Sequence, residues 1–165
     1  MGKILFHVNS MGKGGAEHVI SILSRCFAQD GYDVVVTTLW QADSEYALDG
    51  RVRRVNVGLT QSEETRGRLA KAAIRAFRYR QCIAREKPDI VISFCSKANF
   101  RSAYSMTGMR IPLLVSVRND PQKDYAPYPA KCRYMSRKAA GCVFQTPDAQ
   151  RFFDERLQRK SRVIW

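Results

Sequence analysis

The chain has 165 residues, 45% of them hydrophobic, which is enough for one domain with a sizeable core. It carries 28 Lys and Arg against 15 Asp and Glu, and this net charge of +13 points to an anionic partner, substrate or surface. No apolar run approaches the roughly 20 residues of a membrane-spanning helix, and the start lacks the form of a signal peptide. Five cysteines without a C-x-x-C pair predict reduced thiols. We therefore expect a single cytoplasmic domain over residues 1–165.

The chain opens with an apolar strand that leads into a glycine loop and then a helix. The strand covers 3–9, and apolar residues recur at helical spacing behind the loop until Asp30-Gly31 ends the pattern. In an open α/β sheet such a loop lies at the carboxyl edge, where backbone N–H groups and the helix dipole can face an anion. Gly14 and Gly15, beside Lys13, are the candidate phosphate contacts. The alternative, that the two glycines only permit a tight turn and close helix packing, stays open.

The glycine spacing excludes two common nucleotide-binding loops. Counting from Gly12 and Gly14, the third glycine of a dinucleotide fingerprint is replaced by Glu17. Lys13 precedes the glycine pair and is followed by no Ser or Thr, so the loop is not a P-loop.

Two strands and a long basic helix are expected next. The strands cover 33–39 and 51–57, a polar loop covers 61–67, and the helix runs from Arg66 to Lys87. On this helix Leu69, Phe77 and Ile83 share an apolar side, and cations gather opposite. The basic side predicts either a solvated face or a face that docks on anionic lipid headgroups; nucleic acid is disfavoured because no aromatic residues interleave with the cations. The candidate membrane-facing residues are Arg68, Lys71, Arg75 and Arg78.

The remaining elements continue the alternation of strand and helix. Expected strands cover 90–94, 111–117, 141–145 and 161–165, and expected helices cover 96–106, 130–140 and 147–157. Strands that alternate with helices predict an α/β fold with a doubly wound, mainly parallel, Rossmann-like sheet and helices on both faces.

Polar and basic residues gather where the predicted strands end, which is the edge where ligands bind in such sheets. The candidate binding residues there are Asn9, Ser96, Lys97, Asn99, Arg118, Asn119, Asp120 and Thr146. Arg118 can form two parallel hydrogen bonds with a phosphate or carboxylate, or an ion pair with Asp120 or Asp124. Asn99 and Asn119 also suit turns or caps, and Thr146 suits the N-cap of the following helix. No Asp-x-Asp and no metal-ligand spacing occurs, so neither a metal nor another cofactor is expected.

Several segments resemble the N-terminal half of group 1 glycosyltransferases. They are residues 3–6 and 14–17, 88–94, 116–121, and 144–146 followed by 162–164. The resemblance covers nearly the whole chain, and it implies one half of a GT-B fold, in which two Rossmann-like domains face each other across a cleft. It also implies retaining, metal-independent transfer of a sugar from a nucleotide sugar to a glycan or lipid-linked acceptor in cell-surface polysaccharide synthesis. The glycine loop would then approach the donor diphosphate, and the strand-end residues would line the acceptor side.

Two departures limit what the resemblance implies. Arg118-Asn119 stands where many members place a histidine, so no catalytic residue is assigned. The family's pair of donor-site glutamates, eight positions apart, belongs to the C-terminal domain and does not occur here. We therefore expect this chain to be the acceptor-side domain, inactive alone and peripheral at the inner face of the membrane. The alternative is a non-catalytic module that binds an anionic ligand or a membrane surface.

Overall fold

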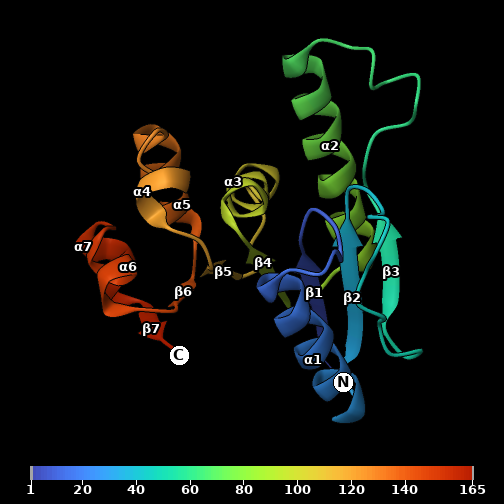
Figure 1. The fold of residues 1–165 in the computed structure, drawn as a ribbon, viewed down its shortest axis with the longest axis horizontal. Helices are drawn as coiled ribbons and strands as arrows, with labels where there is room; N and C mark the ends of the chain where they lie inside the picture. The colour runs from blue at the N-terminus through green and yellow to red at the C-terminus, as the bar shows by residue number, and fades with distance from the viewer. Residues whose placement is uncertain (1, 165) are drawn as a thin grey trace. The chain divides into compact units, whose positions relative to one another are not determined.

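The computed structural model describes residues 2–164, which form two compact units that divide between Asp89 and Ile90. The elements of the first unit are β1 (Lys3–His7), α1 (Gly15–Gln29), β2 (Asp33–Thr38), β3 (Arg53–Asn56) and α2 (Arg68–Glu86) (Figure 1). β1 pairs with β2 and β2 with β3, each in parallel. Val34, Val35 and Val36 are fully buried, as predicted for a strand covered on both faces.

The second unit continues the same alternation. Its elements are β4 (Ile90–Phe94), α3 (Ser96–Ser105), β5 (Leu113–Val117), α4 (Pro121–Asp124), α5 (Pro129–Lys138), β6 (Gly141–Phe144), α6 (Pro147–Arg151), α7 (Glu155–Arg159) and β7 (Ser161–Val163). Adjacent strands from β4 to β7 pair in parallel. The strand order is β3-β2-β1 within the first unit and β4-β5-β6-β7 within the second. The predicted α/β class with a doubly wound parallel sheet is confirmed.

The single helix predicted over 147–157 is wrong. The chain leaves α6 at Phe152 and starts α7 with Asp154 as its N-cap, whose Oδ1 accepts from Leu157 N at 3.0 Å. Between them Phe153 is buried against the rings of Phe144 and Tyr125. Burying this ring interrupts the helix, a tertiary effect that helical composition does not reveal. Of the strand predicted over 161–165, the structure has Ser161–Val163; Trp165 lies outside the described residues.

The predicted orientation of α2 is wrong in its first half. Leu69 and Phe77, expected on the inward side, are 85% and 60% exposed. The side that turns inward there carries Lys71, Arg75 and Arg78, which meet the loop before the helix. Amphipathic spacing locates two faces but cannot say which one meets the protein when the facing segment is an acidic loop. Figure 1 shows the start of α2 extending beyond the strands of its own unit.

None of the five cysteines, all of which lie in residues 2–164, forms a disulfide; Cys82 and Cys142 are buried, while Cys26 is exposed. Within residues 2–164, no helix has both the length and the hydropathy that crossing a bilayer requires.

Candidate functional site

The glycine loop joins the carboxyl end of β1 to the start of α1. Lys13, Gly14 and Gly15 are exposed, and no side chain caps the helix. Neither glycine has a positive φ. A Cβ on Gly15 would meet no atom within 4 Å, whereas one on Gly14 would collide with the Glu17 carboxylate. Neither turn geometry nor packing therefore requires glycine at position 15, and open space lies over the first turn of α1.

Glu45 holds this loop, and it was not found from the sequence. Its Oε1 accepts from Ala42 N at 2.8 Å and from Met11 N at 3.4 Å, and Tyr46 N donates to Met11 O at 2.8 Å. Arg54 forms an ion pair with the same carboxylate. The Arg54 guanidinium is the main reason that the pKa of Glu45 is lowered to about 2. Met11 and Glu45 are 34 positions apart, so local spacing carried no signal of this contact.

We expect Glu45→Gln to destabilise the fold by about 2 kcal/mol at neutral pH, because a charge-assisted contact to Arg54 is lost. A lowered folded-state pKa contributes stability above the ordinary value of 4.5, and that contribution is lost as the pH falls toward about 2. Urea unfolding of wild type and variant at neutral and acidic pH measures the difference, which should shrink in acid. The exposed pair variant Glu155→Gln is the control and should change little. A pH-independent difference for Glu45→Gln would contradict the prediction.

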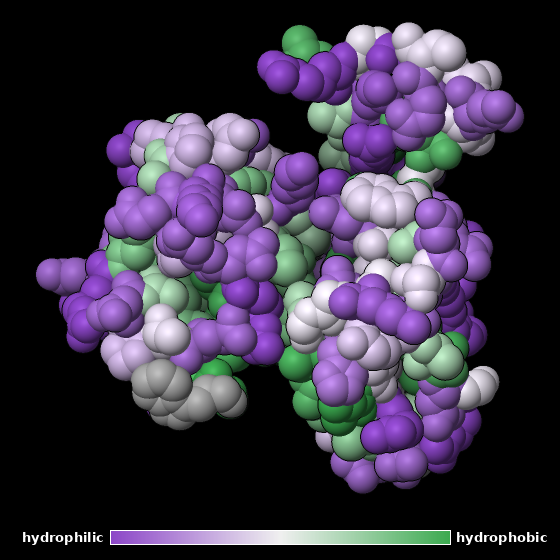
Figure 2. Space-filling model, in the orientation of Figure 1, coloured by the Kyte–Doolittle hydropathy of each residue, from purple (hydrophilic) through white to green (hydrophobic). Residues whose placement is uncertain are grey.

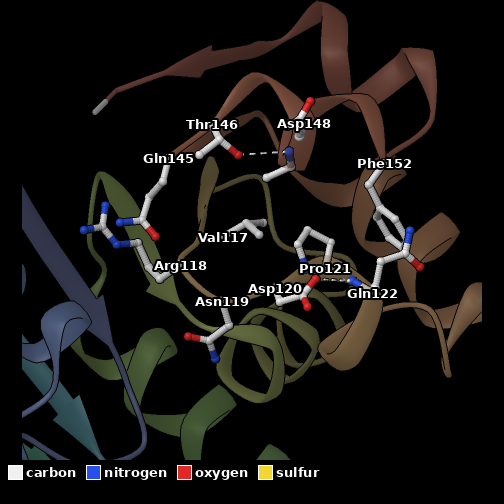
Figure 3. Close-up of a pocket in the computed structure, with 11 residues that line it drawn as sticks. Val117, Arg118, Asn119, Asp120, Pro121, Gln122, Gln145, Thr146, Asp148 and Phe152 are labelled. Atoms are coloured by element: carbon white, nitrogen blue, oxygen red, sulfur yellow. Dashed lines mark hydrogen bonds between the residues drawn. The ribbon is translucent and has the colours of Figure 1, made fainter.

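In the second unit, a cavity of about 410 Å³ opens where β5 and β6 end. Its walls come from the end of β5 with the start of α4 and from the segment after β6 with α6 and Phe152 (Figure 3). The lining residues are Val117, Arg118, Asn119, Asp120, Pro121, Gln122, Gln145, Thr146, Asp148, Ala149 and Phe152. Four of the predicted strand-end residues, Arg118, Asn119, Asp120 and Thr146, are thus brought together.

Arg118 is the cationic residue of this cavity, and it forms no ion pair with Asp120 or Asp124. Its Nε is buried and has no hydrogen-bond partner among the described residues. Figure 3 shows the Arg118 and Gln145 side chains on the same side of the cavity. A buried N–H without an acceptor costs free energy unless a ligand or water satisfies it. The arrangement suits a phosphate or carboxylate that can accept from the guanidinium.

Two other cavity residues use their side chains to begin helices. Thr146 Oγ1 accepts from Ala149 N at 3.1 Å and caps α6, and Asp120 Oδ1 accepts from Gln122 N at 3.0 Å and caps α4. The N-cap alternative for Thr146 is therefore confirmed, and Asp120 has the same role. Both residues remain in the cavity wall.

Asp124 ties the ends of β4 and β5 together. Its Oδ2 accepts from Asn119 Nδ2 at 2.7 Å and from Ser96 Oγ at 3.3 Å. Ser96, which the sequence predicted to bind a ligand, is buried, and its hydroxyl supports Asp124 from within the core. Lys97 follows it at the exposed start of α3. Asn9, half-buried in the first unit, uses its carbonyl to accept from Leu39 N and Trp40 N.

Asn99 lies in the core rather than on the predicted ligand-binding edge. Its Nδ2 donates to Ser116 O at 3.0 Å and to Tyr125 Oη at 2.9 Å, and its Oδ1 accepts from Ser93 Oγ at 2.7 Å. The residue is fully buried, and burial holds the pKa of Tyr125 well above its ordinary range. Asn99 therefore links β4, β5 and the segment after α4 by hydrogen bonds inside the core.

Cys95, between β4 and α3, has φ 69° and ψ 158°, a conformation that favours glycine. Its N–H donates to Ser116 O at 3.1 Å, the carbonyl that Asn99 also contacts. Such an unfavourable backbone conformation persists only when contacts with the surrounding structure hold it in place. The sequence carried no glycine or proline to signal it.

The four α2 residues predicted to face a membrane lie in two environments. Arg68 is exposed at the start of the helix. Arg75 and Lys71 pair with Glu64 at 3.1 and 3.4 Å, and Arg78 pairs with Glu63 at 2.8 Å. The pKa of Glu63 is lowered, first by the Thr60 backbone and further by Arg78. Loop carboxylates therefore neutralise part of the basic side, and membrane contact by these residues stays a prediction.

Among curated proteins, the chain is similar to a transferase from Campylobacter jejuni. It is 23% identical over 116 residues to GalNAc-alpha-(1->4)-GalNAc-alpha-(1->3)-diNAcBac-PP-undecaprenol alpha-1,4-N-acetyl-D-galactosaminyltransferase. The match covers 70% of this chain and 32% of that protein, so the chain spans about a third of its relative.

Solved structures with the same fold include three proteins whose chains are about twice as long. HepE from Anabaena in complex with UDP-glucose matches all of this chain and 44% of its own, with 16% identity and a TM-score of 0.70. MurG from Acinetobacter baumannii matches 99% and 44%, with 15% identity and a TM-score of 0.66. Sucrose-phosphate synthase from Thermosynechococcus elongatus matches 99% and 48%, with 9% identity and a TM-score of 0.70.

The family model of Glycosyltransferase Family 4 matches residues 13–165, which is almost the whole chain. The matched region includes the glycine loop from Lys13 onward and every residue of the cavity. The chain therefore belongs to Glycosyltransferase Family 4, and its resemblance to the N-terminal domain of GT-B glycosyltransferases is confirmed.

Proposed function

We propose that the protein containing this chain transfers a sugar from a nucleotide sugar to a glycan or lipid-linked acceptor in cell-surface polysaccharide synthesis. Family membership supports sugar transfer, and the Campylobacter relative, whose name specifies an undecaprenol-linked acceptor, supports the acceptor class. The observation that carries the proposal is the cavity at the ends of β5 and β6, where Arg118 offers an unpartnered N–H to an anion.

The glycine loop is proposed to approach the donor diphosphate. Open space over Gly15 and the uncapped start of α1 leave backbone N–H groups for an anionic leaving group, with Lys13 as a nearby cation. The complex of HepE with UDP-glucose makes uridine diphosphate sugars the first donors to test. Arg118 and Asn119 are assigned to the acceptor side, with Lys97 at the neighbouring strand end.

We expect Gly15→Ala to lower the transfer rate, because a methyl group would occupy the space that the donor approaches. The same change should raise stability by about 0.5 to 1 kcal/mol, since glycine is unfavourable within a helix. Gly67→Ala is a matched control, because Gly67 precedes α2 and its Cβ would also meet nothing within 4 Å. Transfer assays and urea unfolding measure the two effects. If Gly15→Ala transfers sugar at the wild-type rate, the donor does not approach closely at this position.

The transfer is proposed to be retaining and independent of metal. In residues 2–164 no three His, Cys, Asp or Glu side chains are arranged to hold a metal ion. Backbone N–H groups and cations would stabilise the leaving diphosphate instead. Transfer should persist after treatment with EDTA, and the product linkage should keep the anomeric configuration of the donor in an NMR assay. Loss of activity in EDTA with recovery on adding Mn²⁺ would overturn metal independence, and an inverted product would overturn retention.

A transfer assay of the whole protein decides between an enzyme and a binding module. Uridine diphosphate sugars with different hexoses are incubated with lipid-linked and lipid-free glycans, and the products are identified by mass spectrometry. Transfer of one sugar would support the proposal, and binding of donor or acceptor with no transfer would favour the non-catalytic module. Residues 1–165 alone are expected to bind without transferring, so measurable turnover by them would contradict the assignment to the acceptor side.

Because the proposed acceptor is lipid-linked, we also propose that the protein acts as a peripheral protein at the inner face of the membrane. The predicted contact by the basic side of α2 is one form of this proposal. Arg68 offers an exposed cation for it, whereas Lys71, Arg75 and Arg78 would first have to leave their loop carboxylates.

A further inference from the structure

The positive charge of this chain is concentrated in the second unit. Residues 90–165 hold 14 Lys and Arg against five Asp and Glu, which is +9 of the net +13. No Asp or Glu occurs in residues 90–119 or 125–147, the stretches that contain α3 and α5. The surface of these two helices is therefore cationic without acidic residues of its own.

Among the described residues, ion pairs hold more of the cations in the first unit than in the second, where they engage Arg151 and Arg159. In the first unit, ion pairs engage Lys3, Arg51, Arg53, Arg54, Lys71, Arg75, Arg78 and Arg85. In the second unit, Lys97, Lys131 and Lys138 form no ion pair with any described residue. Lys138 donates to Met109 O at 3.5 Å, and Lys131 lies over the ring of Tyr128 at 4.5 Å. Their charges are not cancelled by neighbouring carboxylates.

α3 and α5 pack against each other and present one continuous face. The rings of Tyr104 and Tyr134 stack at 4.9 Å with an interplanar angle of 10°, and Thr107 Oγ1 lies 2.6 Å from Tyr134 Oη. Residues spaced three or four apart share one side of a helix. On α3 and α5 that side carries Lys97, Arg101, Tyr104, Lys131, Tyr134 and Lys138, which we call the α3–α5 surface.

The aromatic rings of this surface suit the boundary between water and lipid. Tyr104 is 43% exposed, and Tyr128, beside Lys131, is 46% exposed. Tyrosine places an apolar ring and a polar hydroxyl at such a boundary, and lysine extends its ammonium group to the headgroups. Figure 2 shows mostly polar and weakly polar side chains over the helices of the second unit, with few strongly apolar ones. This composition fits headgroup contact rather than deep insertion.

We propose that the α3–α5 surface docks the protein on an anionic phospholipid bilayer. The proposal deepens the proposed function, since it places membrane contact on the same unit as the Arg118 cavity. Nucleic acid is a poorer fit, because the Tyr104 and Tyr134 rings stack on each other and are not free to stack on bases. A lipid surface needs only cations and interfacial rings, and the α3–α5 surface supplies Lys97, Lys131 and Lys138 together with Tyr104.

The test is sedimentation of the protein with vesicles of phosphatidylcholine, with and without phosphatidylglycerol. Wild type should bind only the anionic vesicles, and salt should weaken the binding. Lys131→Gln with Lys138→Gln should lower the affinity about 25-fold, since each cation near the surface is worth about fivefold. Arg156→Gln with Arg159→Gln on α7 removes the same charge elsewhere in the unit and should have little effect. A third double variant, Lys71→Gln with Arg75→Gln, tests the basic side of α2.

Docking by the α3–α5 surface, docking by α2 and binding of nucleic acid each predict a different result. Wild-type binding by the Lys131/Lys138 variant, or an equal loss in the Arg156/Arg159 variant, would overturn docking by the α3–α5 surface. A loss confined to the Lys71/Arg75 variant would overturn it in favour of α2, and tighter binding to duplex DNA than to vesicles would overturn it in favour of nucleic acid. Thermal unfolding shows that each variant is folded. Vesicle binding is measured without donor or acceptor, so its failure and a failure of sugar transfer are distinguishable.

Discussion

Replacing Arg118 with alanine is expected to lower acceptor use by about 10- to 100-fold while changing the unfolding free energy by less than about 0.5 kcal/mol. The reason is that Arg118 Nε is buried in the cavity wall without a partner in the described residues, so the folded protein loses no internal hydrogen bond at that atom. A charge-assisted hydrogen bond to a ligand is worth about 1.5 to 3 kcal/mol, which sets the size of the kinetic effect. The measurement is kcat/KM for the acceptor, with urea unfolding of the same samples.

Two variants make the Arg118 test specific. Arg118→Lys keeps the charge but loses the planar fork, so its kcat/KM should fall between wild type and Arg118→Ala. Lys123→Ala removes an exposed cation from α4 that does not line the cavity, and it should transfer at the wild-type rate. If Arg118→Ala transfers normally, the cavity is not the acceptor site. If it unfolds instead, Arg118 has a structural role.

Asn99→Ala is expected to destabilise the fold by about 3 kcal/mol. The change removes the Asn99 hydrogen bonds of Ser93 Oγ and Tyr125 Oη in the buried core, and leaves Ser116 O with only its bond from Cys95 N. Each buried polar group that loses its partner costs about 1 to 3 kcal/mol, and connected hydrogen bonds lose more together than apart. Urea unfolding measures the effect, and any loss of transfer should follow the loss of folded protein.

Tyr125→Phe provides the control for Asn99, because it removes one hydroxyl and keeps the ring packing against Phe100 and Phe153. It should cost about 1 kcal/mol. The double variant should cost less than the sum of the two single variants, since both changes break the same hydrogen bond. Additive costs would show that the two residues do not share this hydrogen bond, and a fully stable Asn99→Ala variant that loses transfer would show that Asn99 acts at the acceptor.

The position of α2 was predictable from local sequence patterns, but its orientation was not. Its existence and approximate ends followed from apolar spacing and from the lack of glycine and proline, both of which act within a few residues. Which side faces the protein depended on Glu63 and Glu64, in a loop that composition described only as polar. Ion pairs across that loop turned Lys71, Arg75 and Arg78 inward and left Leu69 and Phe77 exposed.

The residues of the cavity were likewise predictable from the sequence only in part. The strand-end rule placed Arg118, Asn119, Asp120 and Thr146 at one edge, because parallel strands all end on the same side of a sheet. Cap chemistry at Thr146 was also predictable, since an N-cap and its proline are adjacent in the chain. The burial of Asn99 was not, because its partners come from β4, β5 and the segment after α4.

The sequence by itself determined the alternation of strands and helices, apart from α4 and the break between α6 and α7, together with the doubly wound parallel class, the family and the edge where polar residues collect. These depend on spacing, capping and motifs, which are local physical properties of the chain. Only the tertiary structure decided that Glu45 clamps the glycine loop, that Arg118 Nε has no partner among the described residues, and that α3 packs against α5 through the ring of Tyr104. Those facts depend on contacts between residues far apart in sequence, where burial and charge pairing select one arrangement from many that local patterns allow.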